Sequence, residues 1–198
     1  MPARAEFFVP ILKGWTTEDA LQVTSDAIQV HGGMGFIEET GVAQHYRDIR
    51  ITTIYEGTTA IQSNDLVGRK VLRDSGVTAE QLFARIDETI AQLRGIEAAA
   101  RTADRLERAV AASRRATADL LGFASSPRDV HAVSVPYLML LGTLAGGWMH
   151  ALAAQAVLAH DVLSARDRER LTSADFYGSH HLPRVAALAD TVAGGEIA

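Results

Sequence analysis

Cysteine is absent from the 198-residue sequence, which excludes disulfide bonds and thiolate metal sites. Aromatic residues are also sparse, at 6%, and there are only five prolines. Alanine, leucine, arginine and glutamate are common instead, and this mixture favours helices. The N-terminus lacks the charged and then apolar pattern of a signal peptide, so a cytoplasmic location is expected.

An excess of positive charge is missing as well, because the formal net charge is −5. A nucleic-acid surface needs a positive patch, so no nucleic-acid partner is expected. Between Val130 and His160 there is no charged residue at all. A membrane-spanning helix needs about 20 apolar residues, but this run is interrupted by polar residues such as His150 and Gln155 and is rich in Ala and Gly. We therefore expect a buried helix of a bundle and no membrane partner.

Helical spacing of apolar residues recurs along the chain and strand-like alternation does not persist, so the fold class is predicted to be all-α. Thr16 and Asp19 form a helix-start signal, and this helix is expected to stop at Gly32. A short helix is predicted for residues 41–48, followed by an irregular, β-branched stretch to Tyr55. A capping box of Thr59 and Gln62 predicts the start of the next helix, which runs towards Arg73.

The residues 74–76, with the sequence DSG, read as a helix stop and as a domain boundary. The predicted domains are residues 1–75 and residues 76–198. In the second domain, residues 78–121 are expected to form two helices or one kinked helix. The uncharged helix follows, then a polar connection over residues 161–168 and a last helix over residues 173–191.

Two segments could carry chemistry, and the first has the sequence QVHGGMGF over residues 29–36. Three glycines in four positions allow a backbone turn with positive φ or the close approach of another molecule. When this segment is taken alone, a simple helix end is the better explanation, because two glycines suffice for most helix ends.

The second segment, residues 54–62, has the sequence IYEGTTAIQ and places the carboxylate of Glu56 just before a helix N-terminus. Gly57 leaves room for a substrate beside the backbone, and helix N–H groups can stabilise negative charge that develops on an oxygen. The alternative is that Glu56 only interacts favourably with the helix dipole. The pattern alone leaves both interpretations open.

Together the two segments, joined by the Tyr-Arg-Asp sequence of residues 46–48, resemble the C-terminal signature of the acyl-CoA dehydrogenases. The resemblance extends to the additional C-terminal domain of the longer, methylthiopropanoyl-CoA dehydrogenase-like members, through residues 127–129, 136–138 and 146–148. It implies a helical bundle like the family's C-terminal domain, followed by an extra helical domain. It is strongest from Leu21 to Leu72.

The resemblance also implies roles for individual residues. Glu56 matches the base that removes the α-proton of an acyl-CoA thioester, and Gly57 matches a position that lines the thioester. One FAD-contacting loop, usually directed at the FAD of a neighbouring subunit, matches Gln29, Val30, His31, Gly32 and Gly33. A second FAD contact matches Thr58, Thr59 and Ala60. Ala60 departs from the members that carry Gln at this position, so no side-chain hydrogen bond to FAD is expected there.

The family also builds its flavin pocket from an N-terminal helical domain and a middle β-domain, and neither pattern occurs here. The sequence is therefore expected to be the C-terminal part of an FAD-dependent acyl-CoA dehydrogenase, inactive alone, with FAD bound in the complete enzyme. The expected partners are acyl-CoA and either the missing domains or a second copy in a dimer. A non-catalytic helical oligomerisation module is the alternative, and a DNA-associated flavoprotein ranks last because of the negative charge.

His180 and His181 could suggest a metal site, but adjacent residues on a helix point in different directions. No metal is expected.

Overall fold

The computed structural model describes residues 2–196, with side chains from Ala5 onward. Nearly all of these residues are helical, and no strand occurs among them, which confirms the predicted all-α class. In chain order the helices are α1 (Pro2–Val30), α2 (Gly33–Phe36), η1 (Glu38–Thr40), α3 (Val42–Arg50), η2 (Ile51–Thr53), α4 (Thr59–Asn64), η3 (Asp65–Leu72), α5 (Val77–Arg94), η4 (Glu97–Ala99), α6 (Ala100–Gly122), α7 (Pro127–Ala132), α8 (Ser134–Leu158), α9 (Ala165–His180) and α10 (Arg184–Ala193).

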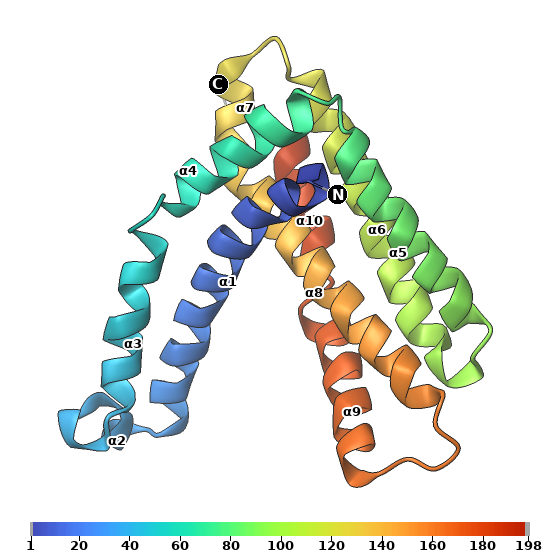
Figure 1. Ribbon diagram of the computed structural model, residues 1–198. Coiled ribbons are helices and arrows are strands. Elements are labelled where there is room, and N and C mark those ends of the chain that lie inside the picture. Colours follow the sequence, from blue (N-terminus) through green and yellow to red (C-terminus); the bar gives the residue numbers. More distant parts are fainter. Residues whose placement is uncertain (1, 197–198) are drawn as a thin grey trace.

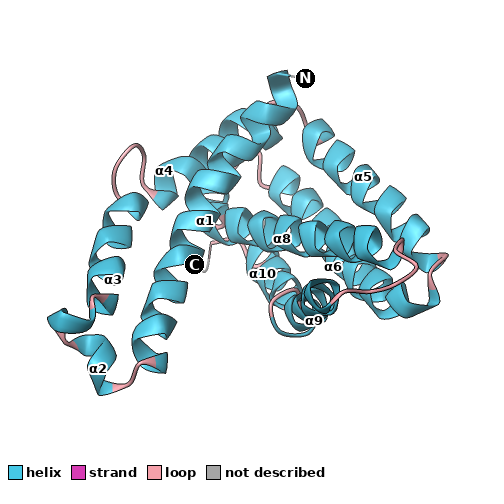
Figure 2. Cartoon of the chain, turned by 60° about the horizontal axis from the view of Figure 1, so that its bottom comes forward, coloured by secondary structure: helices cyan, strands magenta, loops and turns pink. Residues whose placement is uncertain are grey.

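The helices form two limbs that diverge from a common apex, as Figure 1 shows. One limb is built from the C-terminal half of α1 together with α2, η1, α3 and η2, and we call residues 20–54 the arm. The other limb contains α5, α6, α8 and α9, and its helices pack more closely than those of the arm (Figure 2). The N-terminal half of α1 lies against α8 near the apex, so α1 belongs to both limbs.

The uncharged helix predicted from the sequence is α8, and it occupies the centre of the bundle. It packs against α1, α4, α6, α9 and α10, and Leu138, Leu140, Leu141 and Leu144 are fully buried. By length and composition α8 could cross a membrane, but 56% of its most apolar window is buried inside the protein. Its lack of charge follows from contact with other helices on most of its surface.

A single hydrophobic core connects the two predicted domains. Phe7 and Ile11 of α1 and Leu66 of η3 belong to the same cluster as Phe83 of α5 and Val185 of α10. The stop predicted at residues 74–76 is present: Ser75 and Gly76 both have positive φ angles, of 55° and 80°. The boundary between residues 75 and 76 is therefore a break in the helices but not in the core.

Several local predictions are wrong. The first long helix does not begin at Thr16, because the hydroxyl groups of Thr16 and Thr17 donate to the carbonyl groups of Leu12 and Lys13 inside α1. The cap of α4 is Thr58 and not Thr59, since the Thr58 hydroxyl accepts from the backbone of Ile61.

The third wrong prediction is the single last helix over residues 173–191. Two helices, α9 and α10, occupy this region and its flank, and they are separated at residues 181–183. Pro183 has no N–H group to continue α9 and disfavours helical backbone in the residue before it. In addition, α9 begins within the expected polar connection, because Ser164 and Asp167 form a reciprocal capping box. The stretch predicted to be irregular from residue 49 to residue 55 is also largely helical, since α3 continues to Arg50 and η2 covers Ile51–Thr53.

Candidate active-site segment

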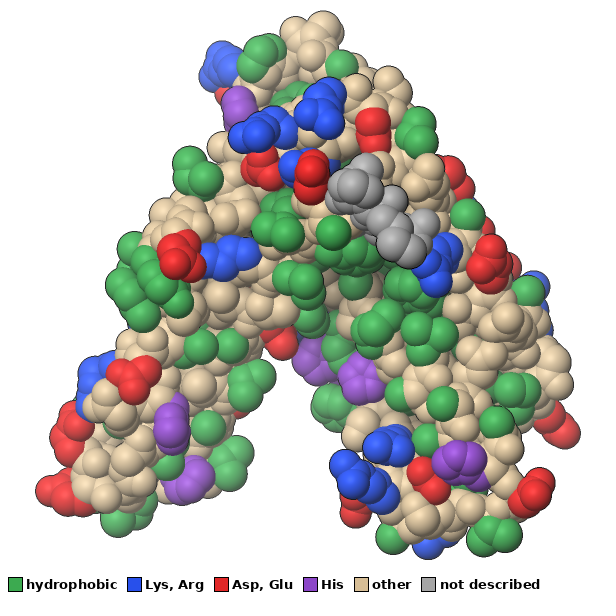
Figure 3. Space-filling view, viewed as in Figure 1, with side chains coloured by type: hydrophobic (Ala, Val, Ile, Leu, Met, Phe, Trp, Pro, Cys, Tyr) green, Lys and Arg blue, Asp and Glu red, His purple; other side chains and the backbone are tan. Residues whose placement is uncertain are grey.

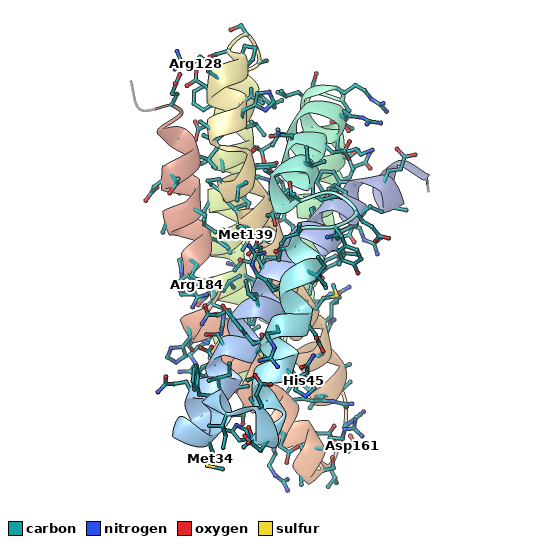
Figure 4. The ribbon with its side chains drawn as sticks, turned by 90° about the vertical axis from the view of Figure 1, so that its left-hand side faces the viewer. Met34, His45, Arg128, Met139, Asp161 and Arg184 are labelled. Carbon is teal, nitrogen blue, oxygen red and sulfur yellow. The ribbon has the colours of Figure 1, made fainter. Side chains whose placement is uncertain are left out.

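The first candidate segment closes α1 at the tip of the arm, where Figure 4 shows the neighbouring Met34. Gly32 has a φ angle of 58°, the left-handed conformation that favours glycine. A Cβ atom built on Gly32 or Gly33 would meet no other atom within 4 Å. The two glycines therefore leave backbone open to another molecule, and Gln29, Val30 and His31 beside them are exposed as well.

Gly35 has a different function from the two glycines before it. A Cβ atom at this position would lie 2.4 Å from the carbonyl oxygen of Ile28, so only glycine allows α2 to pack this closely on α1. Close by, a groove of about 690 Å³ runs between α1 and α3, with Gln29, Phe36, Tyr46 and Arg47 among its lining residues. Arg47 is not free for an anion, because it makes two hydrogen bonds to the Glu38 carboxylate, of 2.8 and 2.6 Å.

The second candidate segment is the loop that connects the arm to α4. Glu56 and Gly57 both have positive φ angles, of 53° and 93°. This conformation costs a non-glycine residue about 1–2 kcal/mol, so other contacts must maintain it at Glu56. One contact is local: the Gln62 side-chain amide donates to the Glu56 carbonyl oxygen at 3.2 Å. The φ angle of Gly57 is one that side-chain-bearing residues rarely adopt, so the turn favours glycine there. A Cβ atom would also come within 2.7 Å of this amide nitrogen, which the flexible Gln62 side chain could relieve by moving.

Two side chains of α1 hold this loop from both ends. Before Glu56, Lys13 donates a hydrogen bond to the Thr52 carbonyl oxygen and lies 5.3 Å from the centre of the Tyr55 ring. After Glu56, the Thr59 hydroxyl donates to a carboxylate oxygen of Glu18 at 2.5 Å. The loop is thus anchored to a long helix on either side of the exposed carboxylate.

The Glu56 side chain itself is exposed, and no ion pair of Glu56 occurs among the described residues. A carboxylate without a cationic partner is free to accept a proton from a bound molecule. Behind it, Thr58 caps α4 by accepting a hydrogen bond of 3.3 Å from the Ile61 N–H. The structure therefore brings Glu56, Gly57, Thr58, Thr59 and Ala60 together in one turn.

The two predicted FAD contacts do not meet within one chain. Thr59 lies level with Glu18, whereas Gln29 is eleven residues further along α1, which corresponds to about 16 Å at 1.5 Å per residue. The resemblance implied that the loop at residues 29–33 contacts the FAD of a neighbouring subunit, and this separation is compatible with that arrangement.

Sequence reasoning missed Lys13 and Glu18. Their spacing on α1 matches no recognised motif, and their significance depends on the loop that returns beside them. Only Lys13 carried a usable signal in the sequence, because it is the one charged residue in the apolar run from Phe7 to Trp15.

The chain thus combines an all-α fold with a carboxylate in a turn of positive φ angles before a helix and with a glycine-rich helix end. Two family models match it. "Acyl-CoA dehydrogenase, C-terminal domain" matches residues 2–72, and "Acetyl-CoA dehydrogenase C-terminal like" matches residues 82–197. The chain belongs to the acyl-CoA dehydrogenase family, and both matched parts are C-terminal ones.

Individual relatives agree with this assignment. The chain is 50% identical to the 3-methylmercaptopropionyl-CoA dehydrogenase of Ruegeria pomeroyi over 92% of its own length and 32% of that protein. It is 29% identical to the broad-specificity linear acyl-CoA dehydrogenase FadE5 of Mycobacterium tuberculosis, over 94% of its own length and 33% of that protein. The chain therefore spans about a third of the length of these relatives.

The resemblance to the longer family members is confirmed by these matches. The two family models stop at residue 72 and resume at residue 82, on either side of the predicted domain boundary. The division into residues 1–75 and 76–198 stays a prediction, since one core spans both parts.

Proposed function

We propose that this chain contributes the catalytic base and two FAD-contacting turns to an FAD-dependent acyl-CoA dehydrogenase. In this reaction the Glu56 carboxylate accepts the α-proton of an acyl-CoA thioester. The product that leaves is the α,β-unsaturated thioester. Bound FAD supplies the acceptor for the hydride from the β-carbon. The proposed location is cytoplasmic, as expected from the sequence.

The observation that carries the proposal is the backbone of the turn at Glu56 and Gly57. Two consecutive residues with positive φ are held by Gln62, by Lys13 and by Glu18. They present, beside a glycine, a carboxylate that has no ion pair within the described part of the chain. Unfavourable backbone conformations of this kind persist where surrounding contacts maintain them, and they are concentrated at functional sites. A carboxylate that served only the helix dipole would need no such turn.

The residues that would hold FAD are Thr58, Thr59 and Ala60 in one copy and residues 29–33 in a second copy. The open space around Gly32 and Gly33 supports this assignment, because a cofactor could approach the backbone directly there. Most of the large apolar side chains that are exposed among the described residues also lie between Val23 and Ile61. We propose that a two-fold dimer, together with segments equivalent to the other two thirds of the relatives, covers this surface.

The test uses a hybrid enzyme in which this chain replaces the C-terminal third of the R. pomeroyi relative. We expect Glu56→Gln to leave flavin content unchanged, because Gln keeps the size of Glu but cannot accept a proton. The rate at which flavin absorbance bleaches after anaerobic addition of 3-methylmercaptopropionyl-CoA should fall about 10²–10⁴-fold.

The matched control is Glu88→Gln, which makes the same chemical change at an exposed position on α5. It should bleach at the parental rate. If Glu56→Gln bleaches as fast as the parent, Glu56 is not the base. A hybrid that folds and forms dimers but stays colourless would favour the alternative function, a non-catalytic helical oligomerisation module.

A further inference from the structure

A buried pair of hydroxyl groups joins α4, which follows the proposed catalytic loop, to α8. Ser63 of α4 is fully buried and Ser134 of α8 is 2% exposed, and their Oγ atoms lie 3.2 Å apart. Ser63 Oγ is also 2.9 Å from the carbonyl oxygen of Ala60, and Ser134 Oγ is 2.9 Å from that of His131. The four residues form one continuous polar line through an apolar interface.

The number of hydroxyl protons limits which of these contacts can be hydrogen bonds at the same time. Each hydroxyl group has one proton, while the line contains three short contacts. When Ser134 donates to Ser63, the Ser63 proton is directed at the Ala60 carbonyl oxygen. When Ser63 donates to Ser134, the Ser134 proton is directed at the His131 carbonyl oxygen. In these two arrangements the bond between the two hydroxyl groups ties α4 to α8 at a defined distance and direction. In a third arrangement both protons are directed at the carbonyl oxygen atoms, and the hydroxyl groups are in contact without a bond between them.

A second polar contact lies next to the first. The Nδ1 atom of His131, on α7, is 3.1 Å from the Oδ1 atom of Asn64, the last residue of α4. An amide oxygen can only accept a hydrogen bond, so the ring contributes its Nδ1–H group to this contact. Residues 63 and 64 at the C-terminal end of α4 therefore each contact the segment that contains the end of α7 and the start of α8.

Apolar packing alone would not fix the rotation and height of α4. Leu66 and Val67 in η3 are fully buried and hold the helix against the core, but apolar contacts are not directional. Hydrogen bonds depend steeply on distance and angle, so they select one rotation and one height of α4. That rotation sets where the turn of Thr58, Thr59 and Ala60 lies, because α4 is only six residues long.

We propose that Ser134 and His131 are positioning residues for the flavin-side turn at residues 58–60 and, through it, for Glu56. Both lie in the part matched by the second family model, residues 82–197, whereas the turn lies in the part matched by the first. The additional C-terminal part of the longer family members thus gains a role at the reaction site without touching substrate or cofactor. This inference rests on the proposed function for its catalytic meaning, but its structural content can be tested independently.

The first experiment measures amide hydrogen exchange in the complete 198-residue chain. Ser134→Ala should accelerate exchange at the amides of Ile61 and Gln62 by roughly three- to ten-fold, which corresponds to the net loss of one hydrogen bond. Ser63→Ala should have a similar effect. The double variant should exchange no faster than the single variants, because both changes break the same contact.

Ser113→Ala is the matched control. Ser113 is also fully buried, but its hydroxyl group donates only to Ala109 within its own helix, at 2.8 Å. This variant should leave the exchange rates of α4 unchanged. His131→Ala is a second test that does not disturb the core, since His131 is exposed, and it should also accelerate exchange in α4. Rates for Ser134→Ala and His131→Ala that match those of Ser113→Ala would overturn the proposal.

The second experiment uses the hybrid enzyme and measures the dissociation constant of FAD by fluorescence. We expect Ser134→Ala to raise this constant by roughly three- to ten-fold, and Ser113→Ala to leave it unchanged. If exchange and FAD affinity are unaffected while Glu56→Gln abolishes bleaching, the positioning role fails and the proposed function stands. If Glu56→Gln bleaches normally while exchange in α4 responds to Ser134→Ala, the proposed base fails and the positioning of the turn stands.

Discussion

At the scale of single residues, a stack of three rings stands out in the bundle. The Tyr177 ring stacks on His150 on one side, with ring centres 4.7 Å apart, and on His181 on the other, at 5.0 Å. Its hydroxyl group donates to the Thr143 carbonyl oxygen at 3.0 Å. Burial lowers the pKa of His150, and the charge that His181 can carry lowers it further. Asp19 of α1 and Arg184 of α10 line the adjacent cavity, in which Tyr177 and His181 also lie.

This stack predicts a pH dependence of stability. A lowered pKa means that the folded protein keeps His150 neutral where the unfolded chain already binds a proton. The unfolded state therefore takes up more protons below the ordinary histidine pKa of about 6.5, and the free energy of unfolding falls as the pH drops through this range. We expect His150→Gln to reduce the loss of stability between about pH 7.5 and pH 5.5. Urea unfolding at several pH values measures this loss of stability in the parent protein and in His150→Gln. An identical loss in both proteins would contradict the lowered pKa of His150.

At the scale of helices, the crossing of α1 and α8 depends on small residues. A Cβ atom on Gly142 would lie 2.1 Å from the Trp15 ring, and one on Gly146 would lie 3.3 Å from the same ring. The Cβ atom on Gly146 would also lie 2.3 Å from the Tyr177 hydroxyl oxygen of α9. On the α1 side, a Cβ atom on Gly14 would lie 2.8 Å from Leu138. Glycine on both helices lets them approach closely, and α1 carries Lys13 and Glu18 next to this crossing. The crossing therefore also determines where the loop around Glu56 is anchored.

Gly142→Ala should destabilise the protein by about 1–3 kcal/mol, because the added methyl group meets the base of the Trp15 side chain, which cannot move away easily. Gly68→Ala is the matched control: a Cβ atom there meets nothing within 4 Å. It should leave stability unchanged or raise it by about 0.5–1 kcal/mol. Thermal and urea unfolding measure the free energies of unfolding of both variants. Equal values would show that α1 and α8 are not tightly packed at Gly142.

At the scale of the whole molecule, the arm exposes more apolar surface than is usual for a protein that stays monomeric. Val30 is 84% exposed and Phe36 is 79% exposed, and Figure 3 shows apolar side chains along the arm and facing the space between the limbs. Exposed apolar patches on this scale usually belong to interfaces. The arm also carries the loop at residues 29–33, so a partner that covers it would meet the proposed FAD contacts.

We expect the 198-residue chain to form dimers at micromolar concentration, as measured by light scattering. Phe36→Glu should shift the population to monomers, because it places a charge in the proposed interface. Val162→Glu, at a position that is 85% exposed but lies outside the arm, should leave dimers intact. A parent chain that is monomeric under these conditions would contradict the proposed dimer.

Much of the architecture could be predicted from local patterns. The all-α class, the end of α1 just before Gly32, the stop at residues 74–76 and the buried nature of α8 depend on backbone preferences and on periodicity over a few residues. The candidate turn at Glu56 and Gly57 could likewise be located from its motif, and its proposed role stays a prediction. These features are determined by short stretches of sequence, because short-range steric contacts and hydrogen bonds control them.

Other features emerged only when distant segments came together. Thr16 and Asp19 have the sequence pattern of a helix start. Thr16 nevertheless lies inside α1, because Phe7 and Ile11 bury the preceding turns in the core. Glu18 meets Thr59 across 41 positions of the chain, and Ser63 meets Ser134 across 71. No local preference encodes such pairs, since each polar group could equally bond to water in the unfolded chain. The packing of α1, α4 and α8 excludes that water and brings the partners within hydrogen-bonding distance.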